Sequence, residues 1–131
     1  MKKRIVYILT GIGILAIILI LAVFRGNEDT WLKDEKGVWV KHGNPSAIPD
    51  KVKAQQEAIN CANERYKFYS GKIEFNSQCL GRCGNYAVDI VHVPRNAEDN
   101  LAENQCTDFL EKKVSSFIEL NKNGNIVRVA D

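Results

Sequence analysis

The stretch FIELNKNGNIVRV, residues 117–129, decides how this chain folds. Two apolar, β-branched runs flank Asn123 and Gly124, a pair that favours a two-residue type I′ turn between antiparallel strands. The register that follows from this turn pairs Ile118 with Val129, Glu119 with Arg128, and Leu120 with Val127. Because the apolar pairs share one face, the sequence predicts a β-hairpin that buries that face.

Upstream of this hairpin the sequence alternates between helix and strand patterns. Residues 50–69 repeat apolar side chains every three or four positions, which indicates an amphipathic helix with Asp50 as its N-cap. Residues 86–93 alternate apolar and polar positions up to Pro94, as a half-buried strand does. Further predicted segments are a hairpin at 30–41, a strand at 73–76, a turn at 79–84, and a loop with a short helix at 96–113. The sequence therefore predicts an α+β fold, with one helix packed on an antiparallel sheet of about four strands.

Residues 5–24 form a run without charged side chains, interrupted only by Thr10, Gly11 and Gly13. At about 1.5 Å per residue, a helix of this length reaches about 30 Å, the thickness of a hydrocarbon core. We therefore expect a transmembrane helix at 5–24. A cleaved signal peptide is the alternative, but the run exceeds the roughly 7–15 apolar residues of such a segment, and no A-x-A-like site follows it.

The charges around this run predict its orientation. Lys2, Lys3 and Arg4 precede it, and the positive-inside rule places such residues in the cytoplasm. The expected organisation is a cytoplasmic tail at 1–4, a transmembrane helix at 5–24, a juxtamembrane hairpin and linker at 25–49, and an exported α+β domain at 50–131. We therefore expect the protein in the cell membrane, with residues 5–24 in contact with lipid and the C-terminal domain outside.

Cys61, Cys79, Cys83 and Cys106 all follow the apolar run. In a small exported domain, an even number of cysteines predicts structural disulfides, here two. A metal site is the alternative, but Cys79 and Cys83 have three residues between them, and zinc knuckles typically have two. The same spacing disfavours the C-x-x-C pattern of a thiol oxidoreductase. We therefore expect two disulfides, no metal and no other cofactor.

Three pairings of these cysteines are open. The short Gly-containing segment between Cys79 and Cys83 favours a bridge between those two, which leaves Cys61 to pair with Cys106. Two crossed pairings also remain open: Cys61–Cys79 with Cys83–Cys106, or Cys61–Cys83 with Cys79–Cys106.

Net charge argues against one class of partner. Residues 1–26 hold four of the 18 basic residues and none of the 16 acidic ones, so the other 105 residues carry 14 basic and 16 acidic side chains. Their net charge of −2 has the wrong sign for binding the anionic backbone of a nucleic acid. We therefore expect no nucleic-acid partner.

Sequence motifs for catalysis are missing. The chain has no nucleophile elbow, H-E-x-x-H zinc site, phosphate-binding glycine loop or dinucleotide fingerprint. Asp89 and His92 point to opposite faces of a strand, so they do not form a catalytic pair. We interpret His92 as a strand-end residue beside Pro94. The sequence predicts no catalytic residue and disfavours an enzyme.

Trp31, Trp39 and His42 are the best candidates for a contact site. Tryptophan is enriched at the energetic centres of interfaces. The alternative is that both tryptophans pack on the small domain itself, or lie near lipid headgroups, with His42 solvated in a loop.

The order of a helix followed by a strand meander resembles cystatin-like and PepSY-like α+β domains. The Gln-x-Val-x-Gly inhibitory loop is missing, so the resemblance implies an architecture and no inhibitory residues. Residues 37–46, GVWVKHGNPS, resemble a short Trp-Val-Lys-His-Gly-Asn-Pro segment of uncharacterised, chiefly archaeal, envelope proteins. This second resemblance implies no activity.

These observations predict a single-pass, membrane-anchored exported protein that serves as a binding or accessory module for an unidentified protein or ligand. One alternative is a structural subunit of a membrane complex, in which residues 5–24 make specific contacts. The other is a small exported enzyme, which would have a deep pocket with His42 or His92 beside a carboxylate.

Overall fold

The computed structural model describes residues 2–25, 29–70 and 78–131, and within the first helix it describes the side chains of Tyr7 and residues 11–21. That helix, α1, spans Lys2–Arg25. Among the described residues, no helix is sufficiently long and apolar to cross a membrane. On this finding, the predicted transmembrane helix at 5–24 and the predicted place in the cell membrane are both wrong.

The chain divides into two units. The first comprises Met1–Thr30 and Lys41–Ser46, and the second comprises Trp31–Val40 and Ala47–Asp131. The second unit contains the main sheet, the hydrophobic core and both disulfides. It also contains every side chain from which a site is built below.

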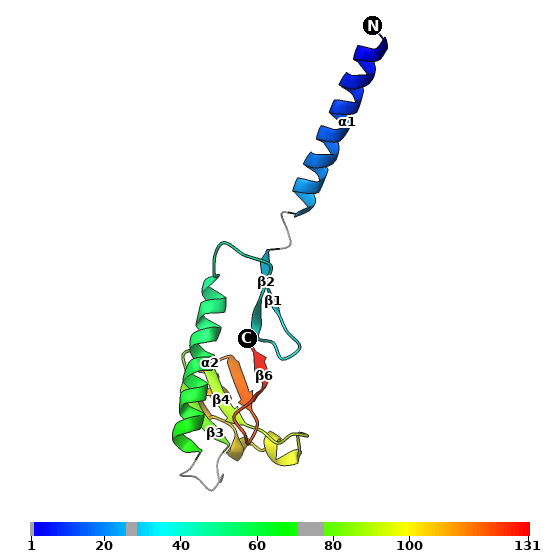
Figure 1. Cartoon of the computed structure of the whole chain (residues 1–131). Coiled ribbons are helices and arrows are strands. Elements are labelled where there is room, and N and C mark those ends of the chain that lie inside the picture. Colours follow the sequence, from blue (N-terminus) through cyan, green and yellow to red (C-terminus); the bar gives the residue numbers. More distant parts are fainter. Residues whose placement is uncertain (1, 26–28, 71–77) are drawn as a thin grey trace. The chain divides into compact units, whose positions relative to one another are not determined.

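Among the described residues, the main sheet has four strands in the order β3-β4-β5-β6 (Figure 1). They are β3 (Cys79–Cys83), β4 (Tyr86–Ile90), β5 (Ser116–Leu120) and β6 (Ile126–Ala130). The β3–β4 and β5–β6 pairs are antiparallel, but β4 and β5 run parallel. The predicted antiparallel sheet is therefore wrong at its central pair. The reason is the long connection at 91–115, because a crossover of this length lets the next strand start from the same end of the sheet.

This crossover covers one face of the sheet. It contains three short helical segments: η1 (Ala97–Asn100), η2 (Ala102–Asn104) and α3 (Thr107–Leu110). Cys106 and Val114 are buried with Ala87 of β4, and the ring of Phe109 meets Phe117 of β5 edge-on at 5.5 Å. The predicted loop with a short helix is thus a packed layer of the fold.

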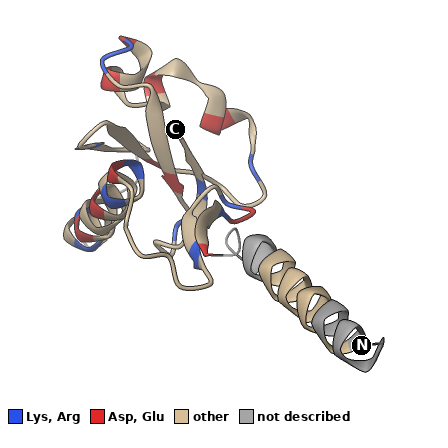
Figure 2. Ribbon diagram, turned by 90° about the horizontal axis from the view of Figure 1, so that it is seen from above, with Lys and Arg blue, Asp and Glu red and all other residues tan. Residues whose placement is uncertain are grey.

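Helix α2 (Asp50–Tyr69) covers the opposite face (Figure 1). Pro49 is its N-cap, so Asp50 is the first helical residue and not the predicted cap. Lys, Arg, Asp and Glu are spread over its exposed surface (Figure 2), as on a solvated helix face. The buried core between α2 and the sheet consists of Ala58, Ala62, Leu80, Cys83, Tyr86, Val88, Ile90, Ile118, Leu120 and Val129. Tyr86, Val88 and Ile90 of β4 face this core, as the alternation in the sequence predicts. Ala87 on the other face is buried too, so the strand is not half-buried as predicted, and it ends at Ile90 and not at residue 93.

Strand β3 replaces the predicted turn at 79–84, and the predicted strand at 73–76 lies outside the described residues. A β-bulge between Cys79 and Gly81, where φ of Gly81 is 99°, interrupts the regular alternation of side chains. In a regular strand Cys79 and Cys83 would point to the same face. With the bulge, Cys83 packs in the core under α2 and Cys79 packs against the crossover.

The disulfides are Cys61–Cys83 and Cys79–Cys106. The prediction of two disulfides is confirmed, but the favoured pairing of Cys79 with Cys83 is wrong, and one of the crossed pairings is present. The bulge is the physical reason, because it directs the two cysteines of β3 to opposite faces of the sheet. One reaches Cys61 on α2, and the other reaches Cys106 in the crossover.

The two hairpin turns share one construction. β1 (Thr30–Lys33) and β2 (Trp39–His42) form the predicted hairpin, and the turn between them is organised by Asp34. Asp34 Oδ1 accepts the backbone N–H groups of Lys36 and Val38, both at 2.9 Å. Such side-chain acceptors stabilise turns by replacing a backbone partner.

Asn121 organises the β5–β6 turn in the same way, with Oδ1 accepting the N–H groups of Asn123 at 2.9 Å and Asn125 at 3.0 Å. The result is a three-residue loop closed by Gly124 at φ 79°, so the predicted type I′ turn is wrong. A register shift after Glu119 pairs Leu120 with Ile126 and not with Val127. The other predicted pairs, Ile118 with Val129 and Glu119 with Arg128, are confirmed.

Candidate functional site

Asp99 is a carboxylate buried in η1, with 3% of the residue exposed. It accepts hydrogen bonds from the backbone N–H groups of Asn96 at 2.9 Å and His92 at 3.1 Å, and from Gln78 Nε2 at 2.5 Å. His92 Nδ1 lies 2.9 Å from Asp99 Oδ1. Burial acts to raise the pKa of Asp99, but these hydrogen bonds outweigh it and lower the pKa to about 2. Asp99 is therefore ionised at any ordinary pH.

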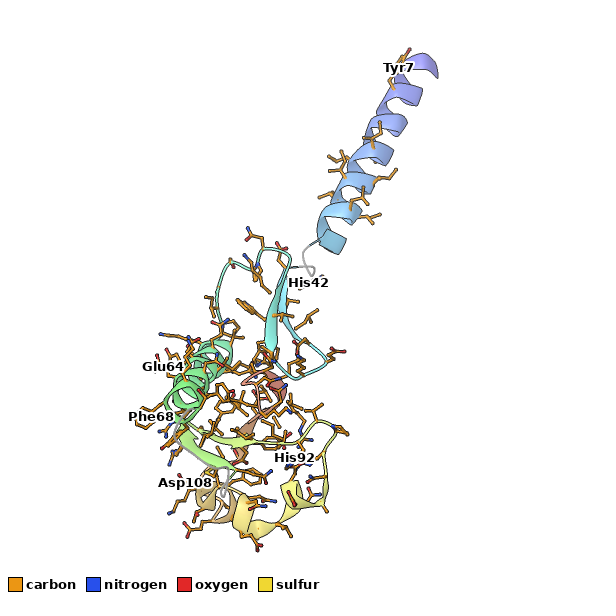
Figure 3. All side chains as sticks on the ribbon, turned by 60° about the horizontal axis from the view of Figure 1, so that its bottom comes forward. Tyr7, His42, Glu64, Phe68, His92 and Asp108 are labelled. Carbon is orange, nitrogen blue, oxygen red and sulfur yellow. A yellow bond between two sulfur atoms is a disulfide. The ribbon has the colours of Figure 1, made fainter. Side chains whose placement is uncertain are left out.

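His92 lies just beyond β4, beside the short helical segments of the crossover (Figure 3). Half of its side chain is exposed. Because ionised Asp99 accepts the hydrogen on Nδ1, the neutral ring carries its lone pair on Nε2. Nε2 lies 3.9 Å from Glu98 Oε2, which is itself mostly exposed. The ring is therefore held at one nitrogen and presents the other to the surface.

An open pocket of about 730 Å³ borders His92. Its walls come from the end of β4, the loop that follows, the crossover and the β5–β6 turn. They are lined by Gln78, Ile90, Val91, His92, Val93, Pro94, Asn96, Glu98, Asn104, Asn121, Lys122 and Asn123. The volume falls within the roughly 300–1,000 Å³ of small-molecule sites. Apolar side chains and neutral amides dominate this lining, so the pocket suits an uncharged molecule with both apolar surface and hydrogen-bonding groups.

A second polar cluster lies on the sheet face under the crossover. Buried Glu119 pairs with Arg95 Nη1 at 2.5 Å and with Arg128 Nε at 3.1 Å. Asp89 is its partner on the parallel strand, and a cavity of about 80 Å³ borders both acids. Burial, followed by the charge of Glu119, raises the pKa of Asp89 to about 7. One carboxyl group inside this fold therefore exchanges its proton near neutral pH.

Among the residues that the structure describes, one group of three side chains has ligand atoms close enough to hold a metal ion. Cys79, Asp89 and Cys106 place these atoms within 4.8 Å of one another. Both sulfurs belong to the Cys79–Cys106 disulfide, and a cysteine binds metal as a thiolate. In the disulfide form this group therefore offers a single carboxylate and is not a metal site.

The predicted contact residues have separate environments. Trp31 is half-buried, and its Nε1 donates to the carbonyl of Ala47 at 3.0 Å. Trp39 is also half-buried, with Lys51 Nζ 4.3 Å and Lys33 Nζ 5.1 Å from the ring centroid. His42 belongs to the first unit, where it is exposed. Each tryptophan thus has contacts of its own within the second unit.

The pairing of His92 with Asp99 was not predicted from the sequence. The pair considered there was His92 with Asp89, and the structure places Asp89 in the other cluster, beside Glu119. Asp99 lies seven residues away in an irregular segment, where strand geometry predicts nothing. The available signal was Asn96 followed three residues later by an acid, which is the pattern of a capping box, and the structure forms one here.

No protein-family model, curated protein or solved structure matches this chain. The resemblances to cystatin-like and PepSY-like domains and to an envelope-protein segment therefore stay predictions. Function has to be argued from the geometry of the site itself.

Proposed function

We propose that this protein is a binding module whose site is the pocket beside His92. The observation that carries the proposal is the fixed imidazole at the pocket wall, held by a buried carboxylate that accepts hydrogen bonds from Gln78 and Asn96 as well. A carboxylate is costly to bury, and here its hydrogen bonds orient a side chain whose other nitrogen is presented to a pocket. This arrangement is that of a preorganised hydrogen-bonding group in a recognition site.

The chemistry of the lining indicates the ligand class. The pocket combines the apolar side chains of Val91, Val93 and Pro94 with amides of Asn and Gln residues. Glu98 and Lys122 contribute one charge of each sign, so the lining favours no net charge on the ligand. The proposed ligand is therefore a neutral molecule rich in hydroxyl or amide groups, such as an oligosaccharide or a blocked short peptide.

The test is a binding screen read residue by residue. Neutral oligosaccharides and blocked peptides at millimolar concentration are added to ¹⁵N-labelled protein, and amide chemical shifts are recorded. We expect shifts at residues 90–98 and 121–123, and a loss of affinity of about tenfold in His92→Ala. His42→Ala should bind like the wild type.

Two outcomes contradict the proposal. The first is the absence of shifts with every compound of both classes. The second is a site whose affinity depends on Trp39 or His42 and not on His92, which would support the contact patch predicted from the sequence.

The geometry of His92 also favours a second candidate, hydrolysis of the bound molecule by a water that Nε2 activates. An imidazole oriented by a carboxylate is the usual arrangement of a general base. Product formation from a ligand found in the screen, abolished in His92→Ala while binding falls only about tenfold, would support it. A bound ligand that stays intact would leave binding as the function.

A further inference from the structure

The Cys79–Cys106 disulfide joins the beginning of β3 to the crossover. Its two cysteines differ in exposure, because Cys79 is half-buried and Cys106 is 2% exposed. An external thiolate would therefore reach Cys79 first. Thiol–disulfide exchange then requires that the sulfur of Cys106 leave, and leaving is faster when that sulfur is protonated or otherwise stabilised.

A carboxyl group lies directly at the leaving sulfur. Asp89 faces Cys79 across the antiparallel β3–β4 pair, so its side chain is on the same face as the bridge. Asp89 Oδ1 lies 2.9 Å from Cys106 Sγ. A disulfide sulfur has no hydrogen, so a hydrogen bond at this contact has to be donated by the protonated carboxyl group.

The surroundings of Asp89 allow it to supply that proton near neutral pH. Burial and the neighbouring charge of Glu119 raise the pKa of Asp89 to about 7, although the backbone N–H of Cys106 and the charge of Arg95 act to lower it. The cavity of about 80 Å³ that borders both acids is large enough for water, which gives the proton a route to solvent. The group is therefore neither permanently charged nor permanently neutral.

We propose that Cys79–Cys106 is an exchange-active disulfide that oxidises dithiols, with Asp89 as the acid that protonates Cys106. A thiolate of the dithiol attacks Cys79 Sγ and forms a mixed disulfide. The Cys79–Cys106 bond breaks, its electron pair goes to Cys106 Sγ, and the Asp89 carboxyl group gives that sulfur its proton. The second thiol of the dithiol loses a proton to water and attacks the dithiol's first sulfur in the mixed disulfide. The bond between that sulfur and Cys79 Sγ breaks, and Cys79 is released as a thiolate. The dithiol ends as a disulfide, and the two cysteines end reduced.

The second disulfide is an internal control. Cys61–Cys83 also joins a half-buried cysteine to a buried one, so the two bridges are similar in exposure. In the part of the chain that the structure describes, no carboxyl group has a recorded hydrogen bond with a sulfur of Cys61–Cys83, whereas Asp89 contacts Cys106. A difference between the reduction rates of the two bridges therefore reflects the presence of Asp89 more than a difference in how easily the reductant reaches them.

The experiment measures both bridges in the same folded sample. Dithiothreitol serves as the dithiol, the reaction is stopped with acid at timed intervals, and free thiols are alkylated and assigned by mass spectrometry. The ratio of the two reduction rates cancels the fraction of reductant present as thiolate. We expect Cys79–Cys106 to react at least about tenfold faster below pH 7, and this advantage to decline as the pH rises through 7 and Asp89 ionises.

Variants assign the effect to Asp89. In Asp89→Asn the rate ratio should fall about tenfold at pH 6 and become independent of pH. Glu103→Gln removes an exposed acid from the same crossover and should leave the ratio and its pH profile unchanged. Circular dichroism checks that each variant is folded.

The wild-type measurement alone can overturn the proposal. Equal rates for the two bridges, or a ratio that does not change between pH 5.5 and 8.5, would show that Asp89 does not assist exchange. A pH profile that survives in folded Asp89→Asn would also overturn it.

Discussion

At the scale of single residues, Gly37 depends on the absence of a side chain for two reasons. Its φ of 82° is a left-handed conformation that glycine adopts without the steric cost of a Cβ. A Cβ built on Gly37 would also lie 2.1 Å from the carbonyl oxygen of Val129. This turn approaches β6 closely because Val129 N–H donates to the carbonyl of Lys36 at 2.7 Å (Figure 1).

Gly37→Ala should therefore destabilise the protein more than a left-handed conformation alone explains. The matched control is Gly84→Ala, where φ is 60° but no atom lies within 4 Å of the added Cβ. We expect Gly84→Ala to lower the free energy of unfolding by about 1 kcal/mol, and Gly37→Ala by about 1–3 kcal/mol more. Urea denaturation measures both. Equal losses would mean that the turn shifts away from β6 at no cost.

At the scale of elements, Gln55 connects α2 to the β1–β2 hairpin. Its side chain is fully buried. Oε1 accepts the N–H of Trp39 at 2.8 Å, and Nε2 donates to the carbonyl of Gly37 at 3.0 Å. One amide side chain thus forms hydrogen bonds with a backbone N–H and a backbone carbonyl of the hairpin, the two kinds of bond that a neighbouring strand would form. The hydrophobic period of α2 does not predict this role, because Gln55 occupies a core position as a polar residue.

Gln55→Ala should leave both of these backbone groups without a partner. We expect a loss of about 2–4 kcal/mol in the free energy of unfolding, since each buried unsatisfied group costs about 1–3 kcal/mol. Gln56→Ala, at the next and less buried position of the same helix, should cost less than about 1 kcal/mol. Thermal and urea denaturation compare the two. Similar effects would argue that water replaces Gln55.

At the scale of the whole molecule, pH acts through two carboxyl groups with opposite shifts. The pKa of Asp89 is raised from 3.8 to about 7, so its stabilising contribution is complete below about pH 4 and is lost as the pH rises through 7. The pKa of Asp99 is lowered from 3.8 to about 2, so its contribution is complete above about pH 4 and is lost as the pH falls through 2. These two groups together place maximum stability near pH 4.

Asp89→Asn should remove the loss at higher pH. In the wild type, the ionisation of Asp89 lowers the free energy of unfolding by up to about 4 kcal/mol between about pH 4 and pH 8. The variant should be nearly level over that range, because asparagine has a similar shape and no charge. Asp99→Asn should instead be less stable than the wild type at pH 7 and keep the decline. Urea denaturation at a series of pH values tests this, and a decline that persists in Asp89→Asn contradicts it.

Local patterns predicted a large part of this fold. The helix at 50–69, both hairpins and two of three pairs across β5 and β6 follow from the spacing of apolar residues and from turn chemistry. Two of the errors were also local in origin: Gly81 was interpreted as part of a turn, and Gly124 as part of a two-residue loop. Asn121 carried the missing signal for the second error, because its side chain accepts hydrogen bonds from the backbone N–H groups of Asn123 and Asn125 in the longer loop.

By itself the sequence determined the helix at 50–69, the strands of both hairpins and the presence of two disulfides, because these depend on residues close together or on cysteine number. The tertiary structure decided that β4 and β5 are parallel, which cysteines pair, and that Asp99 holds His92 at a pocket. The physical reason is that each of these depends on the path of the crossover or on one bulge. The periodicity of apolar residues shows which side of a helix or strand faces inward. It does not show which distant residues pack against that side.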